Sequence, residues 1–224
     1  MKISDLWFEI VYLLRKNGVW GNLVLIAIRI LRLGFPYYSP AVVLFKMDLE
    51  DRNRSREHGD FTIREGNLSD WLAMVGDQTE YRQRKYEQSA TNRFNNGERL
   101  FVVEKNSNLV HYSWIAFTDT IFLPEVRTTV KIPQKAWYIY NSFTSDEVRR
   151  QGIYTAVLVH VAYELGDAGE KELLGYIMAE NIAAKSGIGK TGAWVFQIHH
   201  LTKIMGITVA KSCKTLPKPP PEPV

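Results

Sequence analysis

The chain has 224 residues, which is enough for one domain with a full hydrophobic core, or for one domain and an appendage. Hydrophobic residues make up 46% of the chain and aromatic residues 12%, a composition that excludes a largely disordered protein. The formal net charge is only +4, so we expect no nucleic-acid partner, and an anionic cofactor or a membrane surface suits this charge equally well.

Residues 1–34 predict a helical hairpin that precedes the main domain. Apolar side chains recur at helical spacing over residues 4–17, and a second apolar run extends from Leu23 to Leu33. Arg29 and Arg32 interrupt the second run, which is therefore too short to cross a membrane. Two roles stay open for the hairpin. It contacts the inner face of an anionic membrane peripherally, or it packs on the main domain or on a second subunit, as in a homodimer.

Residues 41–212 predict one α/β (α+β) domain. Its first strands form hairpins and its later strands connect through helices, which indicates a mixed, mostly antiparallel central sheet with helices on both faces. Asn67 or Ser69 is suited to cap the first helix of this domain. The predicted strands cover residues 45–49, 61–64, 100–104, 109–117, 127–132, 136–143, 173–178 and 193–200, and the predicted helices cover residues 67–75, 79–95, 153–165 and 182–190.

Three local features set further expectations for this domain. Phe45, Met47 and Leu49 alternate with charged residues, which is typical of a half-exposed strand. Pro133 is expected to stop the strand that precedes it, because proline cannot donate to a ladder. Gly166 is expected to end the apolar helix of residues 153–165.

The segment after the strand of residues 136–143 combines two arginines with a glycine turn. Gly152 marks the turn, and the buried helix from Ile153 follows it directly. A strand, a glycine turn and a helix in this order present successive backbone N–H groups at a helix N-terminus, a geometry that binds a diphosphate. Arg149 and Arg150 add positive charge there, and the missing side chain of Gly152 lets a phosphate approach the backbone.

These residues resemble motif A of the GNAT superfamily of acyl-CoA N-acyltransferases, whose signature is Gln/Arg-x-x-Gly-x-Gly/Ala. The sequence here is Arg149-x-x-Gly152-x-Tyr154, so the last position departs from the usual small residue. Residues 180–193 resemble motif B, at the expected distance and in the expected order. Residues 61–70 resemble the opening strand and first helix of the family, so the resemblance covers most of the predicted domain.

The resemblance implies an N-acetyltransferase that uses acetyl-CoA (coenzyme A) as co-substrate. The acyl group would pass to a primary amine by direct attack, and the N-terminal hairpin suggests an amino-sugar or envelope-associated acceptor. A strand bulge near Asn141 to Phe143 would offer backbone N–H groups to the thioester carbonyl. The cofactor-binding residues that the resemblance implies are Ser142, Phe143, Thr144, Arg149, Arg150, Gln151, Gly152, Ile153, Tyr154, Thr155, Asn181 and Ser186.

Acyl transfer to an amine also needs proton-transfer groups, because the amine must lose a proton and the leaving thiolate must gain one. Many relatives carry a tyrosine in motif B that protonates the thiolate, and here that position is Ile188. Water or another side chain must take its place. The candidates are Tyr154 and Ser186 for the acid, and Glu180, Tyr140 and His111 for the base.

Two other motifs in the sequence point to different chemistry. Residues 184–191 match a relaxed phosphate-loop pattern, but a nucleoside triphosphatase needs a long helix directly after Lys190-Thr191, and a strand-like run follows. His199 and His200 point to opposite faces of a predicted strand and have no third ligand nearby. We therefore expect no metal.

Residues 213–224 predict a proline-rich, solvated tail. Cys213 is the single cysteine, so an intrachain disulfide is excluded and a reducing, cytoplasmic location is expected. A second class of function stays open: a non-catalytic acyl-CoA-binding or membrane-interaction protein on the same fold. It is motivated by the missing motif B tyrosine and by the absence of a carboxylate from the strand of residues 136–143.

Overall fold

The computed structural model describes residues 37–50, 59–76, 80–204 and 207–219. The predicted hairpin of residues 1–34 lies outside the described residues. Two compact units divide the chain. The larger comprises Pro40–His200 with Ser212–Val224, and the smaller comprises Met1–Ser39 with Leu201–Lys211.

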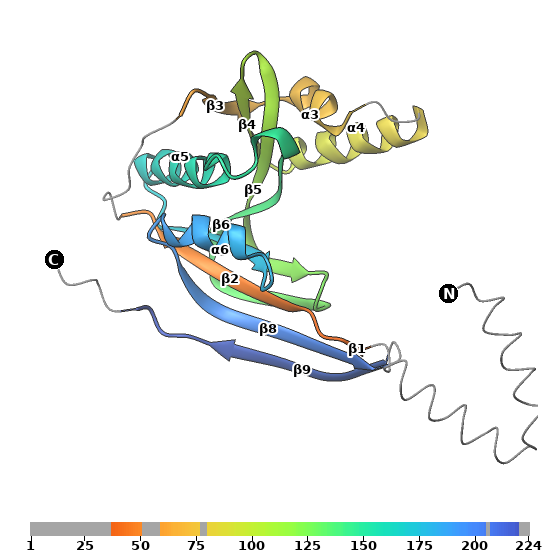
Figure 1. The fold of residues 1–224 in the computed structure, drawn as a ribbon, viewed down its shortest axis with the longest axis vertical. Coiled ribbons are helices and arrows are strands. Elements are labelled where there is room, and N and C mark those ends of the chain that lie inside the picture. The colour runs from red at the N-terminus through yellow and green to blue at the C-terminus, as the bar shows by residue number, and fades with distance from the viewer. Residues whose placement is uncertain (1–36, 51–58, 77–79, 205–206, 220–224) are drawn as a thin grey trace, which may run out of the picture. The chain divides into compact units, whose positions relative to one another are not determined.

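The larger unit contains a mixed sheet whose described neighbours run antiparallel, except for the parallel pair β6 and β7. The strand order in this unit is β8-β2-β7-β6-β5-β4-β3 (Figure 1). In the smaller unit, β1 (Tyr37–Tyr38) pairs with the end of β8. The remaining strands are β2 (Ala41–Asp48), β3 (Thr62–Gly66), β4 (Arg99–Lys105), β5 (Asn108–Leu123), β6 (Thr128–Thr144), β7 (Glu172–Met178), β8 (Trp194–Ile204) and β9 (Ile207–Thr215), which pairs with β8.

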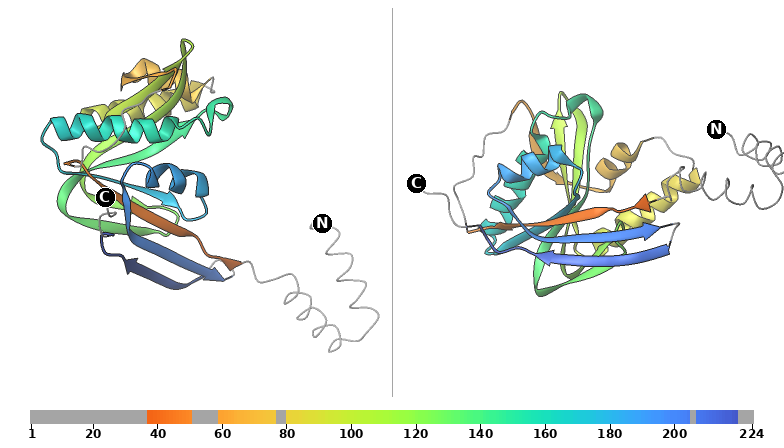
Figure 2. Two further views of the ribbon diagram at one scale, coloured as in Figure 1. Left: turned by 60° about the vertical axis from the view of Figure 1, so that its left-hand side comes forward. Right: turned by 60° about the horizontal axis from the view of Figure 1, so that its bottom comes forward.

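Helices cover both faces of this sheet (Figure 2), which confirms the predicted fold class. Because side chains alternate along a strand, β4 serves both layers. Phe101 and Val103 pack into the core beneath α5 and α6, whereas Leu100 and Val102 pack with Trp71 of α3 on the other face. The described helices are α3 (Leu68–Val75), α4 (Glu80–Asn95), α5 (Ile153–Asp167), α6 (Ile182–Gly189) and the short 3-10 helix η1 (Asp146–Val148).

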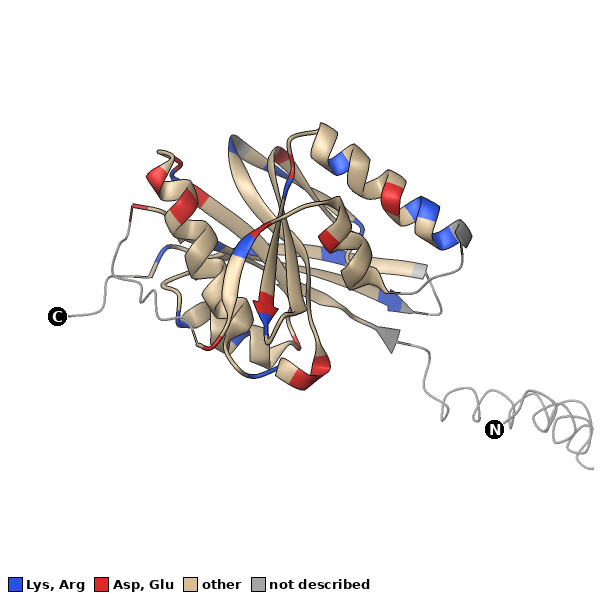
Figure 3. Cartoon of the chain, turned by 90° about the horizontal axis from the view of Figure 1, so that it is seen from above, with Lys and Arg blue, Asp and Glu red and all other residues tan. Residues whose placement is uncertain are grey.

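The polar helix α4 carries charges of both signs along its length (Figure 3). Its residues from Arg82 to Ser89 are exposed, while Ala90 is buried against Trp71 and Trp114. The charges therefore form a solvated face, as the sequence predicts, and a few apolar contacts hold the helix on the sheet.

The strand predicted over residues 45–49 alternates in exposure as expected, because Phe45, Met47 and Leu49 are buried while Lys46 and Asp48 are partly exposed. It belongs to the longer strand β2, which pairs with β7 and β8 and whose earlier residues Val42 to Leu44 are also buried. The ammonium group of Lys46 reaches the Glu172 carboxylate at 2.5 Å.

Pro133 does not stop a strand, and β6 runs through it from Thr128 to Thr144. The ladder to β5 pairs Thr118 with Ala136 and Thr120 with Lys131, so residues 132–135 stand opposite Asp119 alone. Proline is tolerated in such a bulge, because the ladder needs no N–H group there.

Two predicted ends are also displaced. Helix α5 passes through Gly166 and ends at Asp167, and Gly169 takes the left-handed backbone conformation with φ of 86°. Strand β9 extends to Thr215, so the first three residues of the predicted tail belong to the sheet.

Helix α3 begins at a capping box between Asn67 and Asp70. The Asp70 carboxylate accepts from the Asn67 backbone N–H at 2.9 Å and binds the Arg64 guanidinium at 2.7 and 2.8 Å. The hydrogen bonds from Arg64 hold the pKa of Asp70 below its usual value.

We expect Asp70→Asn to destabilise the protein at neutral pH and to flatten the pH dependence of its stability. A lowered carboxyl pKa contributes stability above the unfolded pKa of ~3.9, and this contribution is lost as pH falls through the folded pKa. Urea denaturation between neutral and acid pH measures this difference. Equal slopes for wild type and variant below about pH 4 would contradict the expectation.

Candidate functional site

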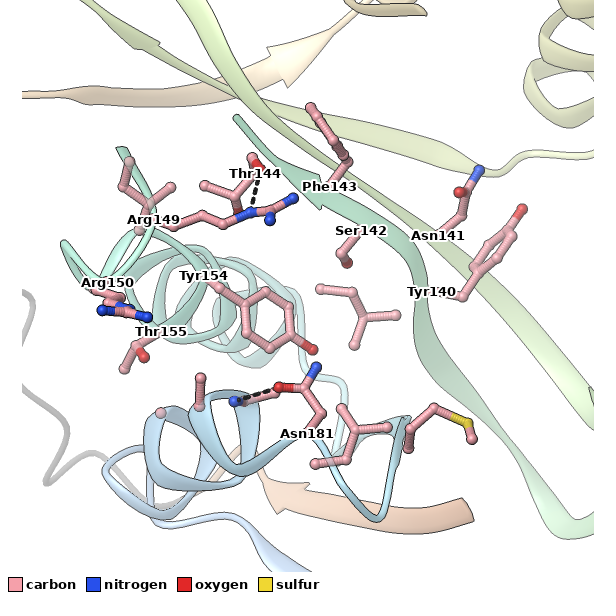
Figure 4. A pocket seen from close by; sticks show the side chains of 18 of the residues that line it. Tyr140, Asn141, Ser142, Phe143, Thr144, Arg149, Arg150, Tyr154, Thr155 and Asn181 are labelled. Atoms are coloured by element: carbon pink, nitrogen blue, oxygen red, sulfur yellow. Dashed lines mark hydrogen bonds between the residues drawn. The ribbon is translucent and has the colours of Figure 1, made fainter. Parts of the chain in front are cut away.

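The parallel strands β6 and β7 pair over only three residues. Trp137 to Ile139 pair with Leu173 to Gly175, and beyond these positions both strands continue without pairing to one another. A cavity of about 670 Å³ lies there, within the size range of small-molecule sites (Figure 4). It is lined by Ile139, Tyr140, Asn141, Ser142, Phe143, Thr144, Val148, Arg149, Arg150, Gly152, Ile153, Tyr154, Thr155, Tyr176, Ile177, Met178, Asn181, Ala183, Ala184 and Gly187.

A bulge in β6 accompanies this separation. The ladder to β5 pairs Tyr112 with Phe143 and Trp114 with Tyr140, so Ser113 alone stands opposite both Asn141 and Ser142. Asn141 has a φ of 47°, a left-handed conformation that asparagine tolerates better than most residues. A bulge bends its strand and leaves backbone groups outside the ladder. The predicted bulge near Asn141 to Phe143 is therefore present.

The turn before α5 forms the end of the cavity. Gly152 has a φ of 77° and a ψ of 4°, and a Cβ atom placed on it would meet no atom within 4 Å. Glycine is thus required by its backbone conformation, and the space beside it is open. The first turn of α5 holds no acidic residue, and its leading N–H groups have no acceptor within the helix. This helix end is suited to an anion.

The two arginines of the turn line the same end of the cavity. Arg149 donates from Nε to the carbonyl oxygen of Thr144 at 3.1 Å, and its guanidinium binds the Asp146 carboxylate at 2.7 Å. Its side chain remains 56% exposed, so it is held in place but accessible to an anion. Gln151 does not line the cavity, because its side-chain oxygen accepts from Lys105 at 2.8 Å.

One face of α6 forms the opposite wall. Asn181 caps this helix by accepting from the Ala184 backbone N–H at 3.0 Å, and Figure 4 shows its amide group directed toward the cavity. Ser186 is exposed and does not line the cavity, while Ile188 is buried in the core. Because residues 184–189 are helical, they do not form the loop that a phosphate-loop motif requires.

Three tyrosines line the cavity, and their hydroxyl groups differ in their partners. Tyr140 donates to the Glu98 carboxylate, and Tyr176 donates to a Glu125 oxygen at 3.4 Å. Tyr154 has no hydrogen-bond partner in the part of the chain that the structure describes, and its ring projects into the cavity (Figure 4).

All three phenols keep their protons at neutral pH. Burial raises the pKa of Tyr154, and burial together with the hydrogen bond to Glu98 raises the pKa of Tyr140. Burial also raises the pKa of Tyr176 to about 12. The tyrosines of the cavity are therefore hydrogen-bond donors rather than phenolates.

Glu180 does not line the cavity. It is exposed in the turn after β7. Among the described lining residues none is Asp, Glu or His. His111 lies behind the bulge, fully buried, and burial lowers its pKa to about 3. Tyr176 and Met178 on β7 also line the cavity and were not predicted, because their position follows only from the separation of the strands.

Comparison with known proteins identifies the fold and no close relative. No family model matches the chain, and no curated protein matches it. A GNAT-family acetyltransferase from Colwellia psychrerythraea is 13% identical over 79% of this chain and 59% of its own, with a TM-score of 0.51. A GCN5-related glucosamine N-acetyltransferase region of a fungal multi-domain GH3 β-N-acetylglucosaminidase is 10% identical over 84% of this chain and 23% of that chain, with the same TM-score of 0.51.

The chain therefore has the GNAT fold, a mixed and mostly antiparallel sheet between helices, as the motifs predict. It spans less than two thirds of the length of both structures. Within residues 37–219, apart from the gaps named above, no helix is long and apolar enough to cross a membrane. No cluster of three or more metal-ligating side chains occurs among the described residues either.

Proposed function

We propose that the protein is an acyl-CoA-dependent N-acyltransferase that moves an acetyl group from acetyl-CoA to a primary amine. The observation that carries this proposal is the separation of β6 from β7 beside the Gly152 turn. The gap gives room for an extended thioester, and the turn offers backbone N–H groups and two arginines to its diphosphate.

The residues of the cavity fit coenzyme A along its length. Arg149, Arg150 and the N-terminus of α5 would hold the diphosphate, with Thr155 in the first turn of that helix. The amide of Asn181 faces the gap and would bind the pantetheine arm, whose amides need partners of this kind. Ser142 to Thr144 would lie along the same arm on β6.

Bound acetyl-CoA supplies an activated acyl group as a thioester. The backbone N–H groups of the β6 bulge lie outside the ladder, so they would stabilise the negative charge that develops on the carbonyl oxygen. Tyr154 is protonated and has no hydrogen-bond partner among the described residues, so it would pass its proton to the departing sulfur and regain one from water. It would thereby replace the missing tyrosine of motif B, where buried Ile188 stands.

The proton of the attacking amine would leave through Tyr140. This phenol lines the cavity and already donates to Glu98, so it can accept the proton of the amine while it passes its own to the carboxylate. Glu180, which we expected as a base from the sequence, is exposed outside the lining and is not part of this route.

We expect Tyr140→Phe to lower kcat by about 100-fold, because general base catalysis is typically worth 10² to 10⁴. Glu98→Gln should lower kcat by a similar factor, and the double variant should lose no more than either single variant. The matched control is Tyr86→Phe, an exposed tyrosine on α4. If the two losses multiplied in the double variant, the two groups would act independently and the route would be wrong.

For the acceptor we propose a small primary amine, with amino sugars as the first class to examine. The glucosamine N-acetyltransferase region named above shares the fold and motivates this choice. Contact with a membrane through residues 1–34 and formation of a homodimer stay predictions from the sequence. Cytoplasmic location is likewise a prediction from the sequence.

A non-catalytic acyl-CoA-binding protein is the second candidate. It is favoured by the lack of a carboxylate or histidine among the described residues of the lining, and by the buried Ile188 in the place of the usual acid. Such a protein would bind acetyl-CoA without consuming it.

Release of thiol from acetyl-CoA in the presence of a panel of amines and amino sugars distinguishes the two candidates. We expect amine-dependent release with at least one acceptor and a matching acetylated product. Saturable binding of acetyl-CoA with no release above the buffer rate on any acceptor would favour the binding protein. Absence of binding at millimolar acetyl-CoA would exclude both candidate functions.

A further inference from the structure

A buried row of hydrogen bonds links two side chains of the cavity wall. Ser142 of the bulge is joined to Ser113 at 2.7 Å, Ser113 to Nε2 of His111 at 2.8 Å, and Nδ1 of His111 to the Thr144 hydroxyl at 2.7 Å. His111 and Ser113 are completely buried. Ser142 and Thr144 line the cavity, so a fully enclosed imidazole is coupled to its wall through hydroxyl groups.

The directions of these hydrogen bonds follow from one of them. Ser113 donates its hydroxyl hydrogen to Ser142. Its oxygen must therefore accept from His111, which makes Nε2 the protonated nitrogen. A neutral imidazole then leaves Nδ1 as an acceptor, and Thr144 donates to it.

The surroundings of His111 keep it neutral. Burial lowers the pKa of this imidazole to about 3. Its hydrogen-bond partners are the hydroxyl groups of Ser113 and Thr144, and the centroid of the Tyr154 ring lies 6.2 Å from that of the imidazole. Tyr154 also keeps its proton. Neither hydroxyl carries a charge that would stabilise an imidazolium.

This arrangement has a consequence for Ser142. Its oxygen is occupied as an acceptor by Ser113, so its own hydroxyl hydrogen has no role within the row and is available to the cavity. Ser142 also belongs to the bulge whose backbone N–H groups are outside the ladder. Side chain and backbone thus offer donors at the same place.

We propose that the Ser142 hydroxyl donates a hydrogen bond to the carbonyl oxygen of the bound thioester, and that His111 is a positioning residue that orients this hydroxyl through Ser113. The inference rests on the proposed function, because it assigns a donor to the substrate of that reaction. A donor whose direction is set before the substrate binds needs no reorganisation when charge develops on the carbonyl oxygen.

Nitrogen-15 NMR of labelled histidine tests the row without a substrate. The chain has five histidines, and His111→Gln identifies the signals of His111 by their loss. We expect a neutral ring protonated at Nε2 that does not titrate from about pH 5 to about pH 8, where an ordinary histidine does. A ring protonated at Nδ1, or one that titrates near its usual pKa, would overturn the proposed direction.

Kinetics test the role of Ser142. Ser142→Ala should lower kcat at least about tenfold, as removal of an oxyanion donor does, and change the Kd for coenzyme A less than about twofold. Ser142→Thr keeps a hydroxyl and should retain most of the activity, and Ser89→Ala on the exposed face of α4 is the matched control. A parallel loss of coenzyme A affinity would assign Ser142 to another part of the ligand and overturn the proposal.

Variants of His111 separate positioning from simple support of the fold. His111→Phe should lower kcat about as much as Ser142→Ala, and the double variant should lose no more than either. His111→Gln keeps one donor and one acceptor and should restore part of the rate. If the losses in kcat of His111→Phe and Ser142→Ala multiplied in the double variant, at equal thermal stability, the coupling between His111 and Ser142 would be refuted. If the wild-type protein binds coenzyme A but shows no turnover, the proposed reaction is wrong. If the wild type turns over and Ser142→Ala keeps full activity, only the proposed role of Ser142 is wrong.

Discussion

Gly152→Asp is expected to lower the affinity for coenzyme A by about 100-fold or more while the protein remains folded. The new carboxylate would stand at the N-terminus of α5, in the cavity that Arg149 and Arg150 also line, where the diphosphate is proposed to bind. Like charges brought together in this way cost several kcal/mol, and ~2.7 kcal/mol corresponds to about 100-fold in Kd. Isothermal titration with coenzyme A measures the change.

The same helix provides a control for backbone strain. Gly169 follows the other end of α5, has a φ of 86°, and has the same open surroundings as Gly152. A non-glycine residue at either position costs roughly 1 kcal/mol in the left-handed conformation. Gly169→Asp should therefore lower the free energy of unfolding at least as much as Gly152→Asp does. It should still bind coenzyme A with the affinity of the wild type. Equal affinities in the two variants would show that the turn does not bind the diphosphate.

Gly175→Ala should produce the largest loss of stability among single methyl additions in this sheet. Gly175 is the last residue of β7 that pairs with β6, and an added Cβ would lie 2.3 Å from Cζ of Phe45 and 3.0 Å from Cγ2 of Ile139. Phe45 is only 1% exposed and cannot swing away. Overpacking of this kind costs about 1–3 kcal/mol, and we expect the upper end of this range by urea denaturation.

The contact with Phe45 can be tested by compensation. Phe45→Leu alone should destabilise the core. The double variant with Gly175→Ala should lose less stability than the sum of the losses in the two single variants. Gly189→Ala is the matched control, since its Cβ would meet nothing within 4 Å and helix α6 should gain from alanine. Additive losses in the double variant would place the cause of the destabilisation elsewhere.

The order of elements and the turn before α5 were predictable because their signals are local. Gly152, the apolar run after it and the strand of residues 172–178 each specify their own conformation. The cap at Asn67 is of the same kind. Ten of the twelve predicted cofactor residues, all except Gln151 and Ser186, line one cavity, and their binding roles stay predictions.

Features that depend on strand neighbours could not be predicted. The alternation of residues 45–49 is present, but β2 begins earlier, at Ala41, where Val42 to Leu44 are buried in succession and pair with β7 and β8. Likewise, Pro133 is harmless only because the β5 ladder skips the residues around it. The pattern within a strand does not encode which strands will lie beside it.

The candidate site shows the same limit. Ser113 and Ser142 lie 29 positions apart, and only the register of β5 on β6 joins them and His111 into one row. Glu180 follows the strand end that the motif indicates, yet the turn directs it away from the cavity lining. Residue type and spacing therefore predicted the residues of the turn that line the cavity, whereas Glu180 and His111, two of the predicted bases, lie outside its lining.

We propose that coenzyme A lies between the separated ends of β6 and β7 with its diphosphate on the turn before α5. Amide NMR spectra recorded during a titration with coenzyme A test this placement residue by residue. We predict that the largest shifts will fall on Gly152 to Thr155 and on Asn141 to Thr144, with little change at Gly169. Saturable shifts confined to other strands, or no shifts at millimolar coenzyme A, would show that coenzyme A does not bind between β6 and β7.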